Sequence, residues 1–355
     1  MATGSTGLLI AGNLRYPGSA LQAFIKPQDR YPVNKTLNEP LVTEPDPRSP
    51  ADAHKLIARV LESGQDIILG KRRELRLALA CLLARGHLLI EDLPGVGKTT
   101  LAHLLAKLLG LNYQRIQFTS DLLPADVVGV SVFDRDNGGF RFHKGPIFTQ
   151  LLLADEVNRA TPRAQSALLE AMEERQVTID GDTYPLPDPF FVIATQNPSE
   201  QIGTFPLPES QLDRFLMRIS IGYPSRDAEL ELLNGENRRD MLSRLEPQLH
   251  LEDLRQLQRQ VDTVHVAEPL LEYIQDLLAY SREAPAFATG LSPRAGLALV
   301  QAARAWALVD GRGHVVPEDV QETLPSVVRH RLGAGNATAD ETDLAQLLIT
   351  NVPIP

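Results

Sequence analysis

Apolar and polar residues alternate along the chain in a regular order from about residue 51 onwards. Five short apolar runs are typical of buried parallel strands. Amphipathic stretches of helical period lie between them, including residues 98–110 and 162–176. Strands that alternate with helices predict an α/β fold, with a parallel sheet between two layers of helices. The predicted strands cover residues 87–91, 113–118, 150–155, 190–195 and 214–222.

Two segments with strand-like alternation interrupt this order. Residues 125–148 carry alternating apolar positions on both sides of the tetrapeptide DNGG, which favours a tight turn. Residues 174–189 show a similar arrangement around Asp180-Gly181. We therefore predict two hairpins inserted into the α/β domain.

The two ends of the chain differ from this central part. Residues 1–50 contain seven prolines and no periodicity, which predicts an extended or disordered segment. After residue 223 the pattern becomes helical, which predicts an α/β domain over 51–223, a helical domain over 224–331 and a tail over 332–355 with one short helix. The predicted helical stretches of that second domain are 225–245, 251–261, 268–284, 292–311 and 316–332.

Composition and charge limit the classes of function. The chain has 355 residues, a formal net charge of −10 and a single cysteine, so it forms no intramolecular disulfide. An acidic total disfavours non-specific binding of nucleic acid, although Arg135, Arg141 and Lys144 in the first hairpin keep that alternative open. No apolar run approaches the roughly 18 residues of a membrane-spanning helix, and we expect a cytoplasmic protein.

One segment, LLIEDLPGVGKTT, predicts a phosphate-binding loop between a strand and a helix. Gly95 and Gly97 let backbone N–H groups line an anion site at the helix N-terminus. The ammonium group of Lys98 can reach the β- and γ-phosphates, and Thr99 can hold Mg²⁺ through its hydroxyl. The usual motif has a glycine where this chain has Asp92, whose side chain we expect to point away from the phosphates. The alternative is a glycine-rich turn without a ligand.

Polar side chains follow two other predicted strands. Asp155 and Glu156 end the third strand, where Asp155 would join the metal shell and Glu156 would act as general base on the attacking water. Asn197 follows the fourth strand and would orient that water or contact the γ-phosphate. Without the loop upstream, these residues also fit a helix N-terminal acidic pair and a turn asparagine.

Four longer stretches resemble those of MoxR-type AAA+ ATPases, in the same order. They read EDLPGVGKTTLA, LLADEVNRATPRAQSALLEAMEERQV, ATQNPSEQIGTFPLPESQLDRFLM and LSPRAGLAL, and the resemblance covers about residues 55–331. It implies an AAA+ P-loop NTPase core with a C-terminal helical lid, assembled as a hexameric ring with nucleotide at the subunit interfaces. The first hairpin resembles the helix-2 insert of that clade, and the second resembles the insert before sensor 1. The family often carries an acidic residue at the position of Asp92.

The resemblance also assigns roles to single residues. Lys98 and Thr99 match Walker A, Asp155 and Glu156 match Walker B, and Asn197 matches sensor 1. Together with a segment that resembles the lining of the adenine pocket, the implied ATP contacts are Pro94, Gly95, Val96, Gly97, Lys98, Thr99, Thr100, Ile68, Leu69 and Gly70.

Two arginines complete the implied site. Arg214, in LDRF, matches the arginine finger that reaches a neighbouring subunit's γ-phosphate, and Arg294, in SPRA, matches sensor 2 on the lid. Taken alone, Arg214 also fits a surface arginine beside a short helix, and Arg294 fits the first turn of a helix capped by Ser292. Lys71 stands where the family more often has glutamine, at the end of the adenine segment.

The function implied by the resemblance is hydrolysis of ATP with Mg²⁺ as cofactor. Such a ring would remodel or mature a client protein, or insert a metal cofactor into it, beside a partner that contains a von Willebrand factor A domain. The alternatives are a nucleic-acid motor of the same clade and a nucleotide-gated scaffold with little turnover.

Overall fold

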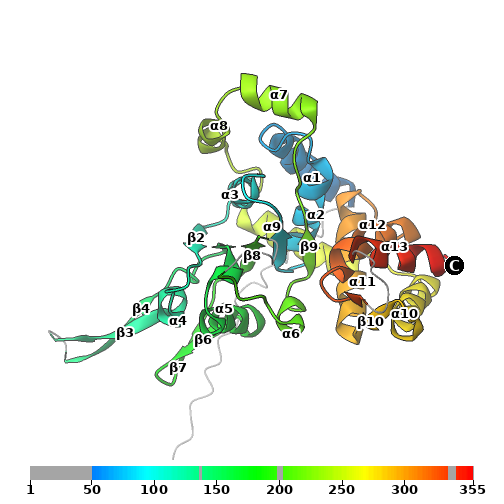
Figure 1. Cartoon of the computed structure of the whole chain (residues 1–355). Coiled ribbons are helices and arrows are strands. Elements are labelled where there is room, and N and C mark those ends of the chain that lie inside the picture. Colours follow the sequence, from blue (N-terminus) through cyan, green and yellow to red (C-terminus); the bar gives the residue numbers. More distant parts are fainter. Residues whose placement is uncertain (1–49, 136–137, 198–202, 335–340, 355) are drawn as a thin grey trace, which may run out of the picture. The chain divides into compact units, whose positions relative to one another are not determined.

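The computed structural model describes residues 50–135, 138–197, 203–334 and 341–354. Five strands form one parallel sheet in the order β2-β5-β8-β1-β9 (Figure 1). Each lies within one of the predicted strand segments, apart from the last residue of β8, and the α/β fold is confirmed. The strands are β1 (Leu88–Glu91), β2 (Tyr113–Gln117), β5 (Leu151–Asp155), β8 (Phe191–Gln196) and β9 (Met217–Ile219).

Alternation along the strands sends side chains into two buried layers. Leu88 and Ile90 belong to one hydrophobic cluster and Leu89 to the other, because successive residues of a strand point to opposite faces. The first cluster also holds residues of α1 (Pro50–Gln65), α2 (Arg72–Leu83) and α3 (Lys98–Leu108). The second holds residues of α4 (Pro124–Val128) and α5 (Pro162–Glu174). Helices therefore cover both faces of the sheet.

Both predicted hairpins are present as two-stranded antiparallel ribbons, β3–β4 and β6–β7 (Figure 1). Asp180 and Gly181 have φ of 54° and 91°, the left-handed conformation that a two-residue hairpin turn requires. The turn predicted for the first hairpin includes Asp136 and Asn137, which lie outside the described residues. Phe142 and Tyr184 stack with ring centroids 4.3 Å apart, so the two hairpins touch. The strands are β3 (Gly129–Asp134), β4 (Gly139–Lys144), β6 (Gln176–Ile179) and β7 (Asp182–Pro185).

The second half of the chain is mainly helical. One predicted helical stretch, 225–245, is two helices, because the chain bends at Gly235 and a new helix begins after Asn237, whose side chain accepts from Arg239 N at 3.0 Å. Residues 287–289 and 333–334 form a short antiparallel pair that no sequence pattern indicated. The helices are α6 (Glu209–Leu212), α7 (Arg226–Asn234), α8 (Arg238–Arg244), α9 (Leu251–Thr263), α10 (Glu268–Glu283), α11 (Pro293–Val309), α12 (Pro317–Val328) and α13 (Glu341–Asn351), the strands β10 (Phe287–Thr289) and β11 (Gly333–Ala334), and one 3-10 turn η1 (Val157–Arg159).

Helix α13, within the predicted tail, is not isolated from the rest. Leu344 and Leu348 are fully buried in the cluster that also contains residues of α10, α11 and α12. The predicted extended segment 1–50 lies outside the described residues, apart from Pro50. Over the described part of the chain, no helix is long and apolar enough to cross a membrane.

Candidate active site

The loop that follows β1 has the backbone shape of an anion site. Gly95 and Gly97 have φ of 87° and 97°, which L-residues rarely adopt, and a Cβ on either would meet no atom within 4 Å. Gly97 is also the N-cap of α3. The loop is therefore open on the side of the glycines and directs the N-terminus of a helix, with its unpaired N–H groups, towards that space.

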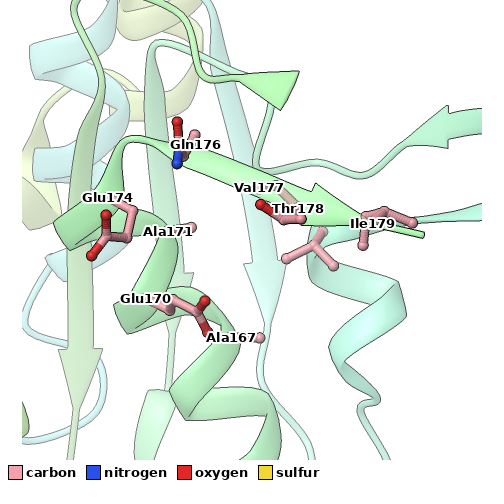
Figure 2. Close-up of a pocket in the computed structure, with 9 residues that line it drawn as sticks. Ala167, Glu170, Ala171, Glu174, Gln176, Val177, Thr178 and Ile179 are labelled. Carbon is pink, nitrogen blue, oxygen red and sulfur yellow. The ribbon is translucent and has the colours of Figure 1, made fainter. Parts of the chain in front are cut away.

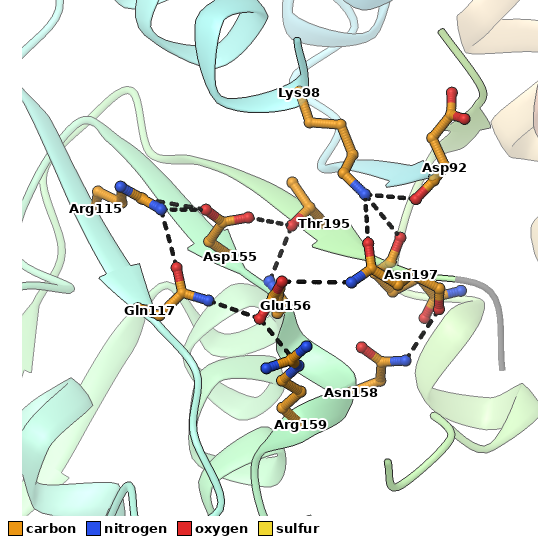
Figure 3. Close-up of polar contacts among 11 residues, drawn as sticks. Asp92, Lys98, Arg115, Gln117, Asp155, Glu156, Asn158, Arg159, Thr195 and Asn197 are labelled. Atoms are coloured by element: carbon orange, nitrogen blue, oxygen red, sulfur yellow. Dashed lines mark hydrogen bonds and ion pairs between the residues drawn. The ribbon is translucent and has the colours of Figure 1, made fainter. Parts of the chain in front are cut away.

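Lys98 connects this loop to the neighbouring strand. Its Nζ donates to the Asp92 carbonyl oxygen at 2.5 Å and to Asn197 Oδ1 at 2.7 Å (Figure 3). Burial lowers the pKa of Lys98, and the carboxylates of Asp92, Asp155 and Glu156 oppose that shift. The structure thus places the ammonium group between the loop and the end of β8, where it can exchange neutral acceptors for a phosphate.

The Asp92 side chain points away from the glycines. Its Oδ2 accepts from Ser220 Oγ at 2.9 Å and from the backbone N–H groups of Ile221 and Gly222, both at 2.6 Å. Its Oδ1 accepts from Leu93 N at 2.8 Å, and the residue is 8% exposed. The carboxylate fixes the segment that follows β9 to the start of the loop, and it leaves the space beside Gly95 free.

Asp155 lies beside the hydroxyl of the loop. Thr195 Oγ donates to its Oδ1 at 2.5 Å, and Thr99 Oγ lies 3.4 Å from its Oδ2. Hydroxyl and carboxylate oxygens are the ligand types that Mg²⁺ prefers, and this metal normally keeps water and substrate oxygens as well. Among the described residues, no group of three or more His, Cys, Asp or Glu side chains forms a metal site. Thr99 and Asp155 therefore fit a metal that arrives with a phosphate ligand.

Glu156 sits next to Asp155 in a strained conformation with three polar partners. Its φ is 56°, in the left-handed region that non-glycine residues rarely enter. Gln117 Nε2 donates to Oε2 at 2.9 Å, Asn197 Nδ2 donates to Oε1 at 3.3 Å, and Arg159 Nε lies 3.0 Å from Oε2 (Figure 3). The structure thus brings Lys98, Glu156 and Asn197 together, as sequence reasoning expected of one site.

Sequence reasoning missed two residues of this cluster. Arg115 donates to Asp155 Oδ2 through Nη2 at 2.7 Å, and its Nη2 also donates to Gln117 Oε1 at 2.9 Å. Both come from β2, where alternate positions share one face of the strand. The sequence carries no clear signal for them, because β2 is an edge strand in which only Ile116 is buried, and polar residues at its exposed positions are ordinary.

The predicted adenine segment lies against the start of the helical region. A Cβ built on Gly70, whose φ is 69°, would lie 3.4 Å from Ala228 Cβ. Lys71 Nζ donates to the carbonyl oxygen of Tyr223 at 2.8 Å. Ile68 and Leu69 are half-buried at the same turn. This turn and residues 220–228 therefore form one wall close to the phosphate loop.

Arg214 and Arg294 lie in another place. Arg294 Nη2 donates to both carboxylate oxygens of Glu173, at 2.7 and 2.8 Å, and Arg214 Nε lies 3.8 Å from Glu173 Oε2. Arg214 precedes β9, and two residues later Leu216 N donates to the carbonyl oxygen of His87, which precedes β1. The two arginines therefore gather at the edge of the sheet where its strands begin, whereas the Lys98 cluster follows the strands. The structure does not bring the two groups together within one chain.

A hollow of about 350 Å³ lies between α5 and β6 (Figure 2). Its mouth carries Glu170 and Glu174, and its floor is apolar, with Val128, Ala171 and Val177 buried. It shares no residue with the Lys98 cluster or with the two arginines. The hollow is thus a separate feature of the surface, and we assign no ligand to it.

Comparisons with known proteins agree with this geometry. The sequence model of the family described as "ATPase family associated with various cellular activities (AAA)" matches residues 87–217, and the model of the AAA lid domain matches residues 279–348. A crystal structure of a presumed ATPase from Cytophaga hutchinsonii superposes with a TM-score of 0.78 at 34% identity, and the match covers 86% of this chain and 97% of that one.

Curated relatives cover most of the chain as well. The protein YeaC of Bacillus subtilis is 47% identical, over 79% of this chain and 88% of its own length. The chaperone MoxR1 of Mycobacterium tuberculosis is 41% identical, over 82% of this chain and 79% of its own length. The protein MoxR of Paracoccus denitrificans is 34% identical, over 75% of this chain and 85% of its own length.

Proposed function

This chain belongs to the MoxR family of AAA+ ATPases, and on that premise we propose that it hydrolyses ATP at interfaces between identical subunits of a ring. The observation that carries the proposal is the division of the polar residues into two groups. Lys98, Glu156 and Asn197 gather at one edge of the sheet, and Arg214 and Arg294 gather at the other. Neither group alone suffices for phosphoryl transfer, and a second copy of the chain supplies the missing half.

The first group has the parts that bind a nucleoside triphosphate. The loop N–H groups and Lys98 would hold the β- and γ-phosphates, and residues 68–70 would contact the base. Thr99 and Asp155 would hold Mg²⁺, which when bound neutralises charge on the phosphate oxygens. For this, Asp155 would exchange its present ion pair with Arg115 for the metal.

The attacking water would be activated by Glu156. Its carboxylate accepts the proton while the water oxygen bonds to the γ-phosphorus and the bond to the β-phosphate oxygen breaks, which releases ADP and phosphate. Gln117 and Asn197 hold Glu156 from two sides and limit its rotation. Such positioning matters because a small misplacement of a catalytic group lowers the rate steeply.

The second group would complete the site of a neighbouring subunit. Charge builds up between the β- and γ-phosphates in the transition state, and an arginine supplied in trans raises the rate about 10³- to 10⁵-fold. Glu173 holds Arg294 and lies beside Arg214, so both guanidinium groups are kept together on one exposed surface. This arrangement fits a head-to-tail contact between subunits, and we propose that these contacts close into a hexameric ring, as the MoxR resemblance implies.

The work done with ATP would be remodelling or maturation of a client protein. One relative carries the name chaperone MoxR1. The β3–β4 hairpin offers a surface for contact with another macromolecule, since Phe133 and Phe140 are 53% and 76% exposed. We further propose a partner with a von Willebrand factor A domain, and a pull-down from the native host that recovers no such protein would count against it.

Nucleic acid is the alternative ligand of that hairpin. Arg135, Arg141 and Lys144 are exposed on it, and Arg141 directly follows Phe140 on β4. Basic and aromatic side chains together can bind single strands by ion pairing and stacking. An ATPase rate that rises on addition of single- or double-stranded DNA would favour a nucleic-acid motor over a protein remodeller.

The experiment that tests the proposed function separates binding from turnover. We expect the Glu156→Gln variant to bind a fluorescent ATP analogue as tightly as the wild type, and to hydrolyse ATP about 10²- to 10⁴-fold more slowly, because the amide cannot accept the proton. Glu170→Gln is the matched control, since Glu170 is an exposed glutamate on α5 away from the cluster. Normal hydrolysis by Glu156→Gln would show that the general base is another residue.

A further inference from the structure

The turn that carries Arg214 is held from the helical domain by a buried arginine. Residues 213–216 connect α6 to β9 and belong to neither element. Arg331, three residues after α12, is 5% exposed in its side chain and donates through Nε to Asp213 Oδ1 at 2.6 Å. Its Nη2 donates to the carbonyl oxygen of Phe215 at 2.7 Å, and its Nη1 donates to that of Leu216 at 3.2 Å.

A buried histidine adds to this arrangement. His330 Nε2 lies 3.0 Å from the Phe215 carbonyl oxygen, so this ring nitrogen carries the proton and donates it. Arg331 Nη2 also reaches the carbonyl oxygen of Asp213 at 3.2 Å. The backbone on both sides of Arg214 is thus bonded to two consecutive residues of the helical domain.

The chemistry of the turn explains why an arginine stands there. A connection without regular structure leaves carbonyl groups unpaired, and a buried carbonyl without a hydrogen-bond partner destabilises the fold. Guanidinium has five N–H donors in a rigid plane, so one side chain can satisfy several acceptors and a carboxylate together. A lysine carries a single ammonium group and cannot reproduce this set.

We propose that Arg331 is a positioning residue for the arginine finger: it fixes the turn 213–216 so that Arg214 faces the nucleotide of the neighbouring subunit. The inference rests on the proposed function, in which Arg214 acts in trans. It assigns to the helical domain a part in hydrolysis on the adjacent subunit, in addition to that of Arg294. Arg331 itself does not touch the nucleotide, because it is buried behind the turn.

Mixed rings test the proposal directly. An Arg214→Ala subunit has an intact nucleotide cluster but no finger, and a Glu156→Gln subunit has a finger but no general base. Mixed together, they should recover ATPase activity at the interfaces where an intact finger faces an intact cluster. We then place Arg331→Lys in one subunit type at a time.

The position of the variant decides the outcome. In the Glu156→Gln subunit, which supplies the finger, Arg331→Lys should lower the recovered activity about tenfold or more, since small displacements of catalytic groups are costly. In the Arg214→Ala subunit it should change the activity less than about twofold. Equal losses in both positions would mean that Arg331 only stabilises the fold, and no loss in either would equally overturn the proposal.

A matched control comes from another ion pair of the same domain. Arg312 donates to both oxygens of the buried Asp319, at 2.5 and 2.6 Å. Among the described residues, it forms no hydrogen bond or ion pair with the turn 213–216. Arg312→Lys should therefore lower the recovered activity equally, if at all, in either subunit type.

Hydrogen exchange separates this inference from the proposed function. Amide protons of residues 214–216 should exchange at least about tenfold faster in Arg331→Lys than in Arg312→Lys, with or without ATP. If the two parent variants fail to complement but this exchange difference is present, the trans action of Arg214 is wrong while Arg331 still holds the turn. If the exchange rates are equal, Arg331 does not hold the turn and the inference fails.

Discussion

The two ends of strand β9 are held by buried charges of opposite sign. At the carboxyl end of β9, the Asp92 carboxylate accepts from Ser220, Ile221 and Gly222. At the amino end of β9, the Arg331 guanidinium donates to the turn 213–216. Asp92 belongs to the phosphate loop, one strand away, whereas Arg331 comes from 118 residues further along the chain. In the proposed ring, the same strand would thus touch the nucleotide cluster of one site and the arginine group of another.

The difference between the two ends of β9 explains which groups of site residues could be predicted from the sequence. The nucleotide cluster follows strand ends, so a local motif and the edge of a parallel sheet suffice to anticipate it. The arginine group depends on Glu173 and Arg331, which no spacing relates to Arg214. Its proposed role depends, in addition, on a second subunit.

The largest expected effect separates the two groups. Lys98→Ala should weaken ATP binding about 100-fold or more, because it removes a cation from a partly desolvated phosphate site. Arg214→Ala should leave the affinity of the isolated subunit within about threefold, although turnover by the ring falls about 10³-fold. Titration of both variants with a fluorescent ATP analogue under monomeric conditions measures this contrast.

Two results would contradict the different roles that we propose for Lys98 and Arg214. If Arg214→Ala lost affinity in the monomer as strongly as Lys98→Ala, the finger would act within its own chain. If Lys98→Ala retained affinity, the loop would not be the phosphate site.

Much of the fold was predictable from periodicity. The five strands, both hairpins and most helices fall where apolar spacing placed them. The break between α7 and α8 was missed although residues 234–240 carry no apolar side chain and include Gly235 and the N-cap Asn237, both of which are signals of a helix boundary. The β10–β11 pair was missed because strands of two or three residues carry no periodicity. The roles of Glu156, Asn197, Arg214 and Arg294 remain predictions. Arg115 and Gln117 escaped notice because only the sheet order brings β2 beside β5.

An effect of intermediate size concerns Asp92, whose carboxylate holds the residues that follow β9. Asp92→Gly restores the usual glycine of the motif, and we expect it to lower the free energy of unfolding by about 2–4 kcal/mol, because several donors lose their buried acceptor. ATP affinity should stay within a few-fold, since the carboxylate faces residues 220–222 and not the glycines. Chemical denaturation and nucleotide titration of the same samples measure both quantities.

Asp92→Asn is the control for this variant. It keeps an acceptor oxygen for the two backbone N–H groups and removes the charge, so its loss of stability should be smaller. A large gain in ATP affinity in either variant would contradict the geometry and show that the carboxylate repels phosphate.

The smallest expected effect concerns His330, which is buried against the turn 213–216 at the amino end of β9. Burial lowers the pKa of His330 well below its ordinary value near 6.5, so the folded state keeps the ring neutral while the unfolded chain takes up a proton. The stabilisation is therefore complete above about pH 6.5 and is lost as the pH falls below it, by about 1 kcal/mol near pH 5.5.

His330→Gln removes the titration, so the gap between its unfolding free energy and that of the wild type should shift by this amount between about pH 7.5 and 5.5. His87→Gln measures the part of the acid loss that a second buried histidine contributes, because burial lowers the pKa of His87 to about 4. Amide exchange is compared at residues 214 and 215, since Leu216 N donates to the carbonyl oxygen of His87 itself. If low pH raised the amide exchange rate of the turn equally in the wild type and in His330→Gln, protonation of His330 would not be the cause of the increase. The turn before β9 would then be held by Arg331 alone.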